Sequence, residues 1–292
     1  MTILRKSVIV TGASSGIGKA TVIKLVESGY QVFGLARRYD KLVLEHANHS
    51  SETLSKESEK DLYVPIEFDI TKSKIFDEVI AKITSKTNEN IIYGLVNNAG
   101  YVEPGSIEDI TMNNLRNQFE TNFFGLVEFT KQVLPLMMLQ RNEIGGRIVN
   151  VSSLAGLMSL PLIGAYSASK HAVEAISDAL RMELWNTNIK VITINPGVTE
   201  TSIYDAFRQK IDDIVKKNDK TRFISAYNKY FAKSDYKGLK SSVVATIIHR
   251  AITLPNPSYR YIIGSRKEKL AVKLRPFIPD RLFYSLVAER IH

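Results

Sequence analysis

The sequence predicts an α/β fold, in which a doubly wound parallel sheet of seven strands has helices on both faces. Seven short apolar runs rich in β-branched residues recur along the chain, and segments with apolar residues at every third or fourth position lie between them. This alternation favours a parallel sheet, because parallel strands need crossover connections and those crossovers are right-handed. The length of 292 residues and the 44% apolar content suit one large core.

Each expected strand is a run of five to eight residues, the length of a fully buried strand. The seven runs are residues 7–11, 31–36, 62–68, 91–98, 146–153, 189–196 and 259–264. Helical periodicity is clearest in residues 17–29, 119–140, 164–184 and 240–252.

Two segments interrupt the alternation of strands and helices. Residues 45–61 are polar and rich in charge, which indicates a solvated loop. Residues 200–238 form an insertion between the sixth strand and the following helix. They carry Tyr204, Phe207, Phe223, Tyr227, Tyr230 and Phe231 among charged residues, a pattern typical of amphipathic helices that close over a cleft.

Composition excludes several classes of site. The absence of cysteine rules out disulfides and thiolate chemistry and suits a reducing cytoplasm. The first apolar run begins at Ser7 and no apolar stretch reaches about 18 residues, so we expect neither a secretory leader nor a membrane span. His46 and His49 have no cluster of further ligands around them, and no metal is expected.

The net charge of +9 is concentrated in one part of the chain. Residues 1–199 hold 20 basic and 21 acidic residues, whereas residues 200–292 hold 19 and 9. The excess is scattered over helical segments that also have apolar faces. It therefore indicates solvated surface or contact with an anionic substrate or membrane, and it argues against nucleic acid as a partner.

The segment "VIVTGASSGIGKA" (8–20) ends a strand with a glycine-rich turn and opens a helix, an arrangement that favours a bound phosphate. A P-loop would need glycine at Ala13 and serine or threonine at Ala20, so that interpretation fails. The spacing of Gly12, Gly16 and Gly18 differs from Gly-x-Gly-x-x-Gly but supplies the same tight turn and close backbone approach to a dinucleotide.

The end of the second strand predicts which dinucleotide binds. An acidic residue there would hold the 2′-hydroxyl of NAD, but the chain has Ala36 followed by Arg37 and Arg38. Guanidinium groups fit a 2′-phosphate better. The sequence thus predicts NADP(H), with one or both arginines on the phosphate and solvated surface charge as the alternative.

Two Tyr-x-x-x-Lys pairs occur, Tyr166 with Lys170 and Tyr236 with Lys240. Such spacing arises by chance, but it brings two side chains together only on a helix. Gly238 weakens any helix that contains the second pair.

Further motifs carry a resemblance to a known family. They are Thr11-Gly12-x-x-x-Gly16-Ile17-Gly18, Asp69 in "FDI", "NNAG" at 97–100, Asn122 in "ETNFFG", Ser153 in "NVSSLAG", Tyr166-x-x-x-Lys170 and "NPGVTET" at 195–201. Over roughly positions 5–265 the chain resembles the short-chain dehydrogenases/reductases, nearest to their hydroxysteroid and retinol dehydrogenase and acyl-dihydroxyacetone-phosphate reductase branch. The family's serine precedes its tyrosine by 13 residues, as Ser153 precedes Tyr166, whereas Phe223 holds that position before Tyr236.

The resemblance implies a Rossmann-type domain and a catalytic set of Asn122, Ser153, Tyr166 and Lys170. Tyr166 would act as general acid and base, because reduction of a carbonyl needs a proton and oxidation of an alcohol needs a base. Lys170 would lower the pKa of Tyr166 and hold the nicotinamide ribose, Ser153 would hydrogen-bond the reacting oxygen, and Asn122 would anchor a water beside Lys170.

The resemblance also implies the residues that contact the two ligands. The expected cofactor residues are Gly12, Ser14, Ser15, Gly16, Ile17, Gly18, Arg37, Arg38, Asp69, Ile70, Asn98, Ala99, Gly100, Tyr166, Lys170, Pro196, Gly197, Thr199 and Thr201. The expected substrate residues are Ser153, Leu154, Leu160 and Tyr166.

The apolar segment "LAGLMSLPLIG" (154–164) and the 200–238 insertion favour a lipid-like carbonyl or alcohol as substrate. The alternative is an NADPH-binding regulatory or scaffold protein that uses its basic C-terminal part for a partner or a membrane. An enoyl reductase on this fold would need tyrosine and lysine farther apart.

We expect a domain over residues 1–265, with residues 200–238 as its lid, and a C-terminal helical extension over 266–292. In the extension, Pro276 and Pro279 separate two short helical patterns. The second places Leu282, Phe283, Leu286, Val287 and Ile291 on one face, which must be covered because so short a helix is marginal alone. We expect its own domain or a second subunit of a homodimer to cover it, with an anionic membrane as the alternative.

Overall fold

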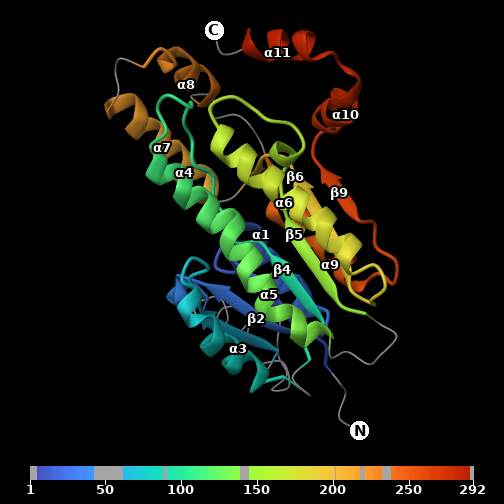
Figure 1. Ribbon diagram of the computed structural model, residues 1–292. Helices are drawn as coiled ribbons and strands as arrows, with labels where there is room; N and C mark the ends of the chain where they lie inside the picture. The colour runs from blue at the N-terminus through green and yellow to red at the C-terminus, as the bar shows by residue number, and fades with distance from the viewer. Residues whose placement is uncertain are drawn as a thin grey trace.

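A computed structural model of the chain contains the seven expected strands in one sheet (Figure 1). The structure describes residues 5–42, 62–87, 91–138, 145–200, 202–217, 221–231 and 238–289. The strands are β1 (Ser7–Thr11), β2 (Gln31–Ala36), β3 (Tyr63–Glu67), β4 (Gly94–Asn97), β5 (Arg147–Val151), β6 (Lys190–Pro196) and β9 (Arg260–Ile263). All neighbours pair in parallel in the order β3-β2-β1-β4-β5-β6-β9, which confirms the predicted fold class.

Helices cover both faces of this sheet (Figure 1). One face packs against α1 (Gly16–Glu27) and α9 (Ser241–Thr253), and the other against α3 (Phe76–Thr84), α5 (Gly125–Met138) and α6 (Gly164–Glu183). A 3₁₀ turn, η2 (Ser73–Ile75), leads into α3. Along β1, Val8 and Val10 point into the first core and Ile9 into the second, so the strand is apolar on both sides, as a central parallel strand must be.

The helical segment expected over 119–140 is interrupted in the structure. It begins at the last residue of α4 (Met112–Phe119) and continues as a π-helical turn η4 (Glu120–Phe124) and then α5, while residues 139 and 140 lie outside the described residues. Helical periodicity does not distinguish a single π turn from a continuous helix, so the interruption was not predicted.

The 200–238 insertion is helical, as expected. It contains α7 (Ser202–Lys217) and α8 (Ile224–Phe231), and two short strands, β7 (Thr199–Glu200) and β8 (Leu239–Lys240), pair in parallel at its base. The expected loop at 45–61 lies outside the described residues.

The 200–238 insertion has a small core of its own. Phe207, Ile211 and Tyr227 are buried against Leu162 of the 154–164 segment. The Tyr227 hydroxyl accepts a bond from the Ser106 amide (2.7 Å) and donates to the Asp109 carboxylate (2.8 Å). Phe207 and Tyr227 thus hold α7 and α8 together and against the segments around Ser106 and Leu162.

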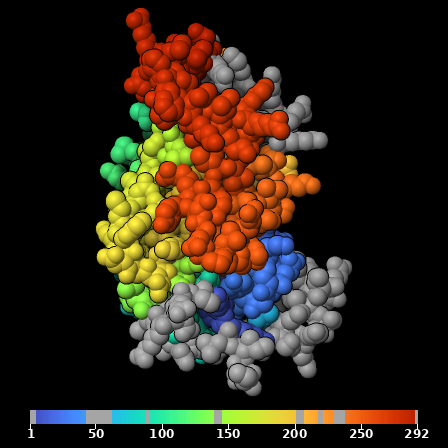
Figure 2. Space-filling view, turned by 90° about the vertical axis from the view of Figure 1, so that its right-hand side faces the viewer, coloured from blue at the N-terminus to red at the C-terminus, as the bar shows by residue number. Residues whose placement is uncertain are grey.

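The C-terminal segment contains the two expected helices, α10 (Arg266–Leu274) and α11 (Asp280–Ala288), joined by a 3₁₀ turn η6 (Arg275–Phe277). On the expected apolar face of α11, Phe283 and Val287 are partly buried, but Leu282 and Leu286 are 52% and 51% exposed. Ile291 lies outside the described residues. The chain's own domain therefore leaves half of this face uncovered, and Figure 2 shows the segment protruding at one end of the molecule.

Among the described residues, no helix is both long and apolar enough to cross a membrane.

Candidate active site

The expected site residues gather at the carboxyl ends of the strands. The order of the sheet reverses between β1 and β4, so the loops that follow these two strands diverge and leave a crevice. Gly12 follows β1 and Asn98 follows β4, and the loops after β5 and β6 carry Ser153 and Gly197.

The turn after β1 requires its glycines. Gly12 and Gly16 have φ of 67° and 54°, in the left-handed region. A Cβ on Gly12 would lie 2.9 Å from Ala99 Cα, and one on Gly18 would lie 2.2 Å from the Gly12 oxygen. The first and third glycines thus bring the start of α1, which includes Ile17, close to the β4 loop.

Hydrogen bonds fix the β1 and β4 loops to each other. The Thr11 hydroxyl accepts bonds from the Asn98 and Ala99 amides, both at 3.0 Å, and Asn98 Nδ2 donates to the Thr11 and Gly12 oxygens at 2.9 and 3.3 Å. Sequence reasoning did not assign this role to Thr11. The bonds hold one wall of the crevice rigid before any ligand binds.

Arg38 lies across the mouth of the glycine-rich turn. One of its guanidinium nitrogens is 3.1 Å from Ser15 Oγ and 3.4 Å from Ser14 Oγ. Ser15 occupies the N-cap position of α1 without a side-chain cap bond, and the first turn carries no acidic residue. A cation, two hydroxyls and a helix N-terminus therefore meet at one place, which is a favourable environment for a phosphate group.

Arg37 faces a different part of the crevice. Burial and, to a smaller extent, the Glu103 charge raise the pKa of Tyr101, in the loop after β4, to about 12, against the opposing effect of the Arg37 charge. Arg37 is therefore near enough to Tyr101 to act on it electrostatically.

Two expected cofactor residues follow β3. Asp69 Oδ1 accepts bonds from the Thr71 amide (3.1 Å) and hydroxyl (2.8 Å), which orients the carboxylate at the end of the strand. Ile70 is buried, and a Cβ on Gly125 of α5 would lie 2.4 Å from the Ile70 oxygen. Ile70 thus helps to place α5.

Tyr166 and Lys170 lie one turn apart near the start of α6. Lys170 Nζ donates to the Val151 oxygen at 2.8 Å and lies 5.8 Å from the centre of the Tyr166 ring. The Ser153 side chain lies near enough to the Tyr166 hydroxyl to lower its pKa, and Ser153 Oγ accepts a bond from the Ala155 amide (3.1 Å) in the short 3₁₀ helix η5 (Leu154–Gly156). The structure thus brings together the serine, tyrosine and lysine that the sequence singled out. Tyr236 lies outside the described residues.

Burial shifts both titratable groups of this set toward their neutral forms. It raises the pKa of Tyr166, against the opposing effect of Ser153, so the lowered pKa that we expected Lys170 to give Tyr166 is not found: in the protein alone, burial outweighs the nearby ammonium. It lowers the pKa of Lys170 to about 8, and the negative charge of Glu174 partly offsets that effect. The charge of Lys170, which would favour a Tyr166 phenolate, is therefore itself sensitive to its surroundings near neutral pH.

Asn122 lies in the π-helical turn η4 and is fully buried. Its Oδ1 accepts the Tyr101 amide at 3.0 Å, and its Nδ2 donates to the Tyr101 oxygen (3.0 Å) and to Ser169 Oγ (3.2 Å). A Cβ on Gly100 would lie 3.1 Å from Asn122 Oδ1 and 3.7 Å from Lys170 Nζ. Asn122 and Lys170 thus border the same point of the β4 loop, and the contacts of Asn122 with Tyr101 and Ser169 were not anticipated.

The loop after β6 closes the far side of the site. Ser153 Oγ is 3.5 Å from the Pro196 oxygen, and the Gly197 amide donates to the Ile263 oxygen at 2.7 Å. Thr199 Oγ1 donates to the Gly197 oxygen at 3.0 Å, so this hydroxyl is engaged within the loop. Thr201 lies outside the described residues.

The two leucines expected at the substrate differ in exposure. Leu154 is buried in η5, whereas Leu160 is 37% exposed in the loop that leads to α6. Leu162 in the same loop has φ of 63°, a strained conformation for leucine that its burial in the lid core maintains. Leu160 is thus the better placed of the two to meet a ligand.

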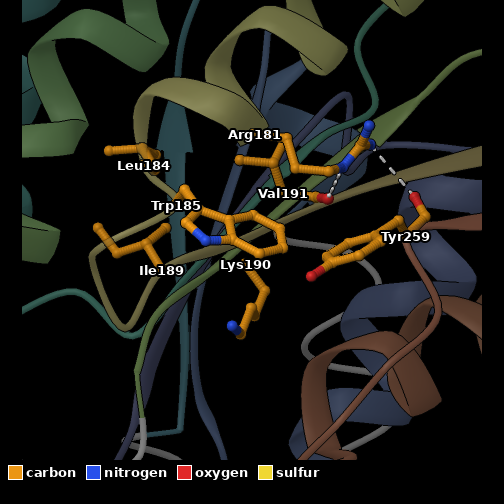
Figure 3. Close-up of a pocket in the computed structure, with 7 residues that line it drawn as sticks. All are labelled: Arg181, Leu184, Trp185, Ile189, Lys190, Val191 and Tyr259. Atoms are coloured by element: carbon orange, nitrogen blue, oxygen red, sulfur yellow. Dashed lines mark hydrogen bonds between the residues drawn. The ribbon is translucent and has the colours of Figure 1, made fainter.

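A small pocket lies elsewhere in the structure, and none of the expected site residues line it. It lies where β6 and β9 begin, at the opposite end of the sheet, and Figure 3 shows its seven lining residues. Arg181 crosses it and donates to the Val191 and Tyr259 oxygens at 3.0 and 3.3 Å. These bonds satisfy the guanidinium, which indicates a structural role.

Comparisons with known proteins agree with the fold. A family model described as "short chain dehydrogenase" matches residues 6–212. An NADPH-dependent 3-dehydrocapnine reductase of Ornithobacterium rhinotracheale is 32% identical over 94% of this chain and 93% of its own length. A 3-ketodihydrosphingosine reductase of Bacteroides thetaiotaomicron is 32% identical over 96% and 98%. A crystal structure of an actinorhodin polyketide ketoreductase with NADPH has a TM-score of 0.73 and 27% identity over 89% of this chain and 96% of that chain.

Proposed function

Because the chain belongs to the short-chain dehydrogenase family, oxidoreductases that interconvert carbonyls and alcohols, we propose that it is an NADP(H)-dependent carbonyl reductase with Tyr166 as its general acid and base. The observation that carries the proposal is the convergence of Ser153 and Lys170 on Tyr166, with Lys170 Nζ 5.8 Å from the centre of the Tyr166 ring.

In reduction, Ser153 would hold the carbonyl oxygen of the substrate within reach of the Tyr166 hydroxyl. A nicotinamide bound beside them would supply the hydride. Tyr166 then donates its proton to the oxygen, and the Lys170 ammonium stabilises the phenolate that remains. Asn122 holds the Tyr101 backbone beside Lys170, and we propose that it also anchors a water that returns a proton to the site.

The cofactor cradle fits NADP(H) better than NAD(H). Gly12, Gly16 and Gly18 leave room for a pyrophosphate on the turn, and Arg38 with Ser14 and Ser15 provides donors for a 2′-phosphate. A relative is named as NADPH-dependent. The remaining cofactor residues expected from the sequence, Thr201 included, stay proposals.

We propose a lipid-like carbonyl as the substrate. The 154–164 loop is apolar, with Leu160 exposed, and it packs against a lid whose own core is apolar. One relative is named for the reduction of 3-ketodihydrosphingosine, a ketone. That compound belongs in the first panel of substrates.

We propose that the C-terminal helices contact an anionic membrane surface. Leu270, Leu274, Phe277, Leu282 and Leu286 are 44–81% exposed, and exposed basic residues such as Lys269, Lys273 and Arg281 lie among them. If two copies of the protein met through this surface about a two-fold axis, basic residues of one copy would face basic residues of the other and repel them. Anionic lipid would attract the same residues. Residues 266–292 would then be an extension separate from the domain over 1–265.

The homodimer and the cytoplasmic location expected from the sequence also remain proposals. Phe124 and Met138 at the two ends of the α5 region are each 52% exposed, and a second copy would cover such side chains. Light scattering at two protein concentrations tests the homodimer, because it measures whether the mass in solution is that of one chain or of two.

Tyr166→Phe tests the proposed function. NADPH consumption is measured against a panel of ketones and aldehydes that includes 3-ketodihydrosphingosine. The substitution removes only the transferable proton, so we expect kcat to fall by about a thousandfold while the Kd for NADPH changes little. Tyr236→Phe, in the second Tyr-x-x-x-Lys pair, should behave as the unmodified protein.

Retention of most of the kcat in Tyr166→Phe would refute the role of this tyrosine. Tight NADPH binding without turnover of any carbonyl would favour the alternative, a regulatory or scaffold protein on the same fold.

A further inference from the structure

Glu174 is a buried carboxylate that the mechanism above does not use. It lies on α6 one turn beyond Lys170 and two turns beyond Tyr166, and it is only 6% exposed. Residues four apart on a helix share a face, so the three side chains form a row. Burying a carboxylate is unfavourable unless it is well paired, which makes its partners informative.

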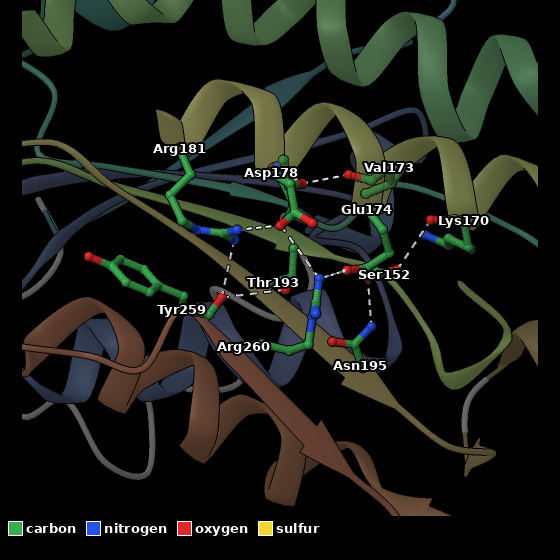
Figure 4. A network of polar contacts seen from close by, with 12 residues as sticks. Ser152, Lys170, Val173, Glu174, Asp178, Arg181, Thr193, Asn195, Tyr259 and Arg260 are labelled. Carbon is green, nitrogen blue, oxygen red and sulfur yellow. Dashed lines mark hydrogen bonds and ion pairs between the residues drawn. The ribbon is translucent and has the colours of Figure 1, made fainter. Parts of the chain in front are cut away.

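Two partners from different strands hold Glu174 (Figure 4). Asn195 Nδ2, from β6, donates to Glu174 Oε1 at 2.6 Å, and an Arg260 guanidinium nitrogen, from β9, lies 2.8 Å from Glu174 Oε2. Arg260 also lies 3.5 Å from Asp178, which is half exposed and forms an ion pair with Arg181. The charged groups facing Glu174 in the described structure are thus Lys170, Asp178 and Arg260.

The bond to Asn195 connects Glu174 to the catalytic serine. The same Asn195 nitrogen donates to the Ser153 backbone oxygen at 3.1 Å. Turning the amide over would place its oxygen against two acceptors, the carboxylate and the carbonyl, so Glu174 and the Ser153 carbonyl together determine which way Asn195 points. The carboxylate therefore acts on the position of Ser153 through one intervening side chain.

We propose that Glu174 is a positioning residue for both partners of Tyr166. Through Asn195 it fixes Ser153, and its negative charge, moderated by Arg260, keeps the buried Lys170 ammonium protonated. The inference rests on the proposed function, in which a charged Lys170 stabilises the Tyr166 phenolate.

The direct test measures the titration of Lys170 in the protein without cofactor or substrate. Lysines are labelled with ¹³C at Cε, and the Lys170 resonance is assigned by its loss in Lys170→Arg. Burial lowers the pKa of Lys170 to about 8 and Glu174 opposes this, so we expect the midpoint in Glu174→Gln to fall by at least about half a pH unit. Glutamine keeps the size of the side chain and an oxygen that accepts the Asn195 bond.

Arg260→Gln provides a change of opposite sign. Without the guanidinium, the Glu174 charge acts on Lys170 undiminished, and the midpoint should rise. Asp178→Asn is the matched control, because it removes a carboxylate from the same cluster one turn farther from Lys170, and it should leave the midpoint in place. A loss of folding stability alone would not produce shifts of opposite sign in two variants.

A second readout uses the reaction. The alkaline limb of kcat/KM for carbonyl reduction should follow the charge of Lys170, since a neutral lysine leaves the phenolate unsupported. In Glu174→Gln this limb should move to lower pH by the same amount as the midpoint. A midpoint in Glu174→Gln that stays at the wild-type pH, or that moves no more than in Asp178→Asn, would overturn the inference. The NMR midpoint is independent of turnover, so absence of activity on every carbonyl would refute the proposed function alone.

Discussion

Lys170 shows how a single residue links the fold to the chemistry. It is 5% exposed, with its ammonium on the Val151 oxygen, and burial brings its pKa to about 8. A lysine so placed destabilises the fold while it is charged, because the unfolded chain solvates the same charge better. The site therefore keeps a charged group at a cost in stability, which only a role in function or in specificity would maintain.

This cost predicts how stability depends on pH. The pKa of Lys170 is about 8 in the folded chain and 10.5 in the unfolded one, so between these values the unfolded chain binds more protons and stability rises with pH. From pH 7 to 10, the wild type should gain up to about 3 kcal/mol in free energy of unfolding relative to Lys170→Met. Denaturant unfolding at several pH values measures it, with exposed Lys82→Met as the control. A constant difference between wild type and Lys170→Met would contradict the shift.

Arg38 rather than Arg37 is the expected clamp for the 2′-phosphate, since its guanidinium lies against Ser14 and Ser15. A charge-assisted contact of this kind contributes about 1.5–3 kcal/mol, so Arg38→Ser should raise KM for NADPH by about 10- to 100-fold. KM for NADH should change little, because NADH lacks the phosphate. Arg37→Ser is the matched comparison, and a larger effect of Arg37→Ser on KM for NADPH would exchange the roles of the two arginines.

Among the elements, the π-helical turn η4 is the one whose irregularity serves the site. An extra residue in the turn lets Asn122 point inward and bond both backbone atoms of Tyr101. In a regular helix over the same residues, the Asn122 side chain would point in another direction around the helix axis and would not face Tyr101. The π-helical turn thus connects α4 and α5 to the loop after β4, next to the position of the Lys170 ammonium.

The exposed face of α11 makes a prediction at the same scale. Leu282→Gln with Leu286→Gln should weaken binding to vesicles of phosphatidylcholine and phosphatidylserine by about tenfold or more, since two leucines no longer enter the lipid. Mass and melting temperature should not change, because both side chains are about half exposed. Co-sedimentation measures the binding, with Met182→Gln, 70% exposed on α6, as the control.

A fall in mass of the double variant, with vesicle binding unaffected, would instead identify α11 as a contact between subunits. Binding of the wild type to phosphatidylcholine vesicles without anionic lipid would contradict the contribution of the basic residues.

At the scale of the whole molecule, the sequence was sufficient to predict the sheet. All seven strands lie within the expected runs, because a parallel strand covered on both faces must be apolar throughout and such runs are easily located. The placement of Ser153 beside Tyr166 and Lys170 was also predicted, since a helix brings Tyr166 and Lys170 together and a motif identifies Ser153. Their catalytic roles stay a prediction.

Features that depend on distant partners were not predictable. Pairing of β7 with β8 involves two residues on each strand, too few to leave a pattern. The importance of Glu174 depends on Arg260, 86 residues away in the sequence, and on Asn195. The four-residue spacing from Lys170 was the only signal available, and without the partners it could not be distinguished from a solvated helix position.

The pairing of β7 with β8 has a consequence for how this protein can change over evolution. Thr199 pairs with Leu239 and Glu200 with Lys240, and Ser241 Oγ donates to the Glu200 oxygen at 3.0 Å, so the 200–238 insertion begins and ends at one place. Insertions, deletions or wholesale exchange between those points leave the seven-stranded sheet and the cradle for the dinucleotide untouched. The insertion can therefore be replaced as a unit, and recombination can bring new side chains to the proposed substrate site without any change to Tyr166 and Lys170 on α6.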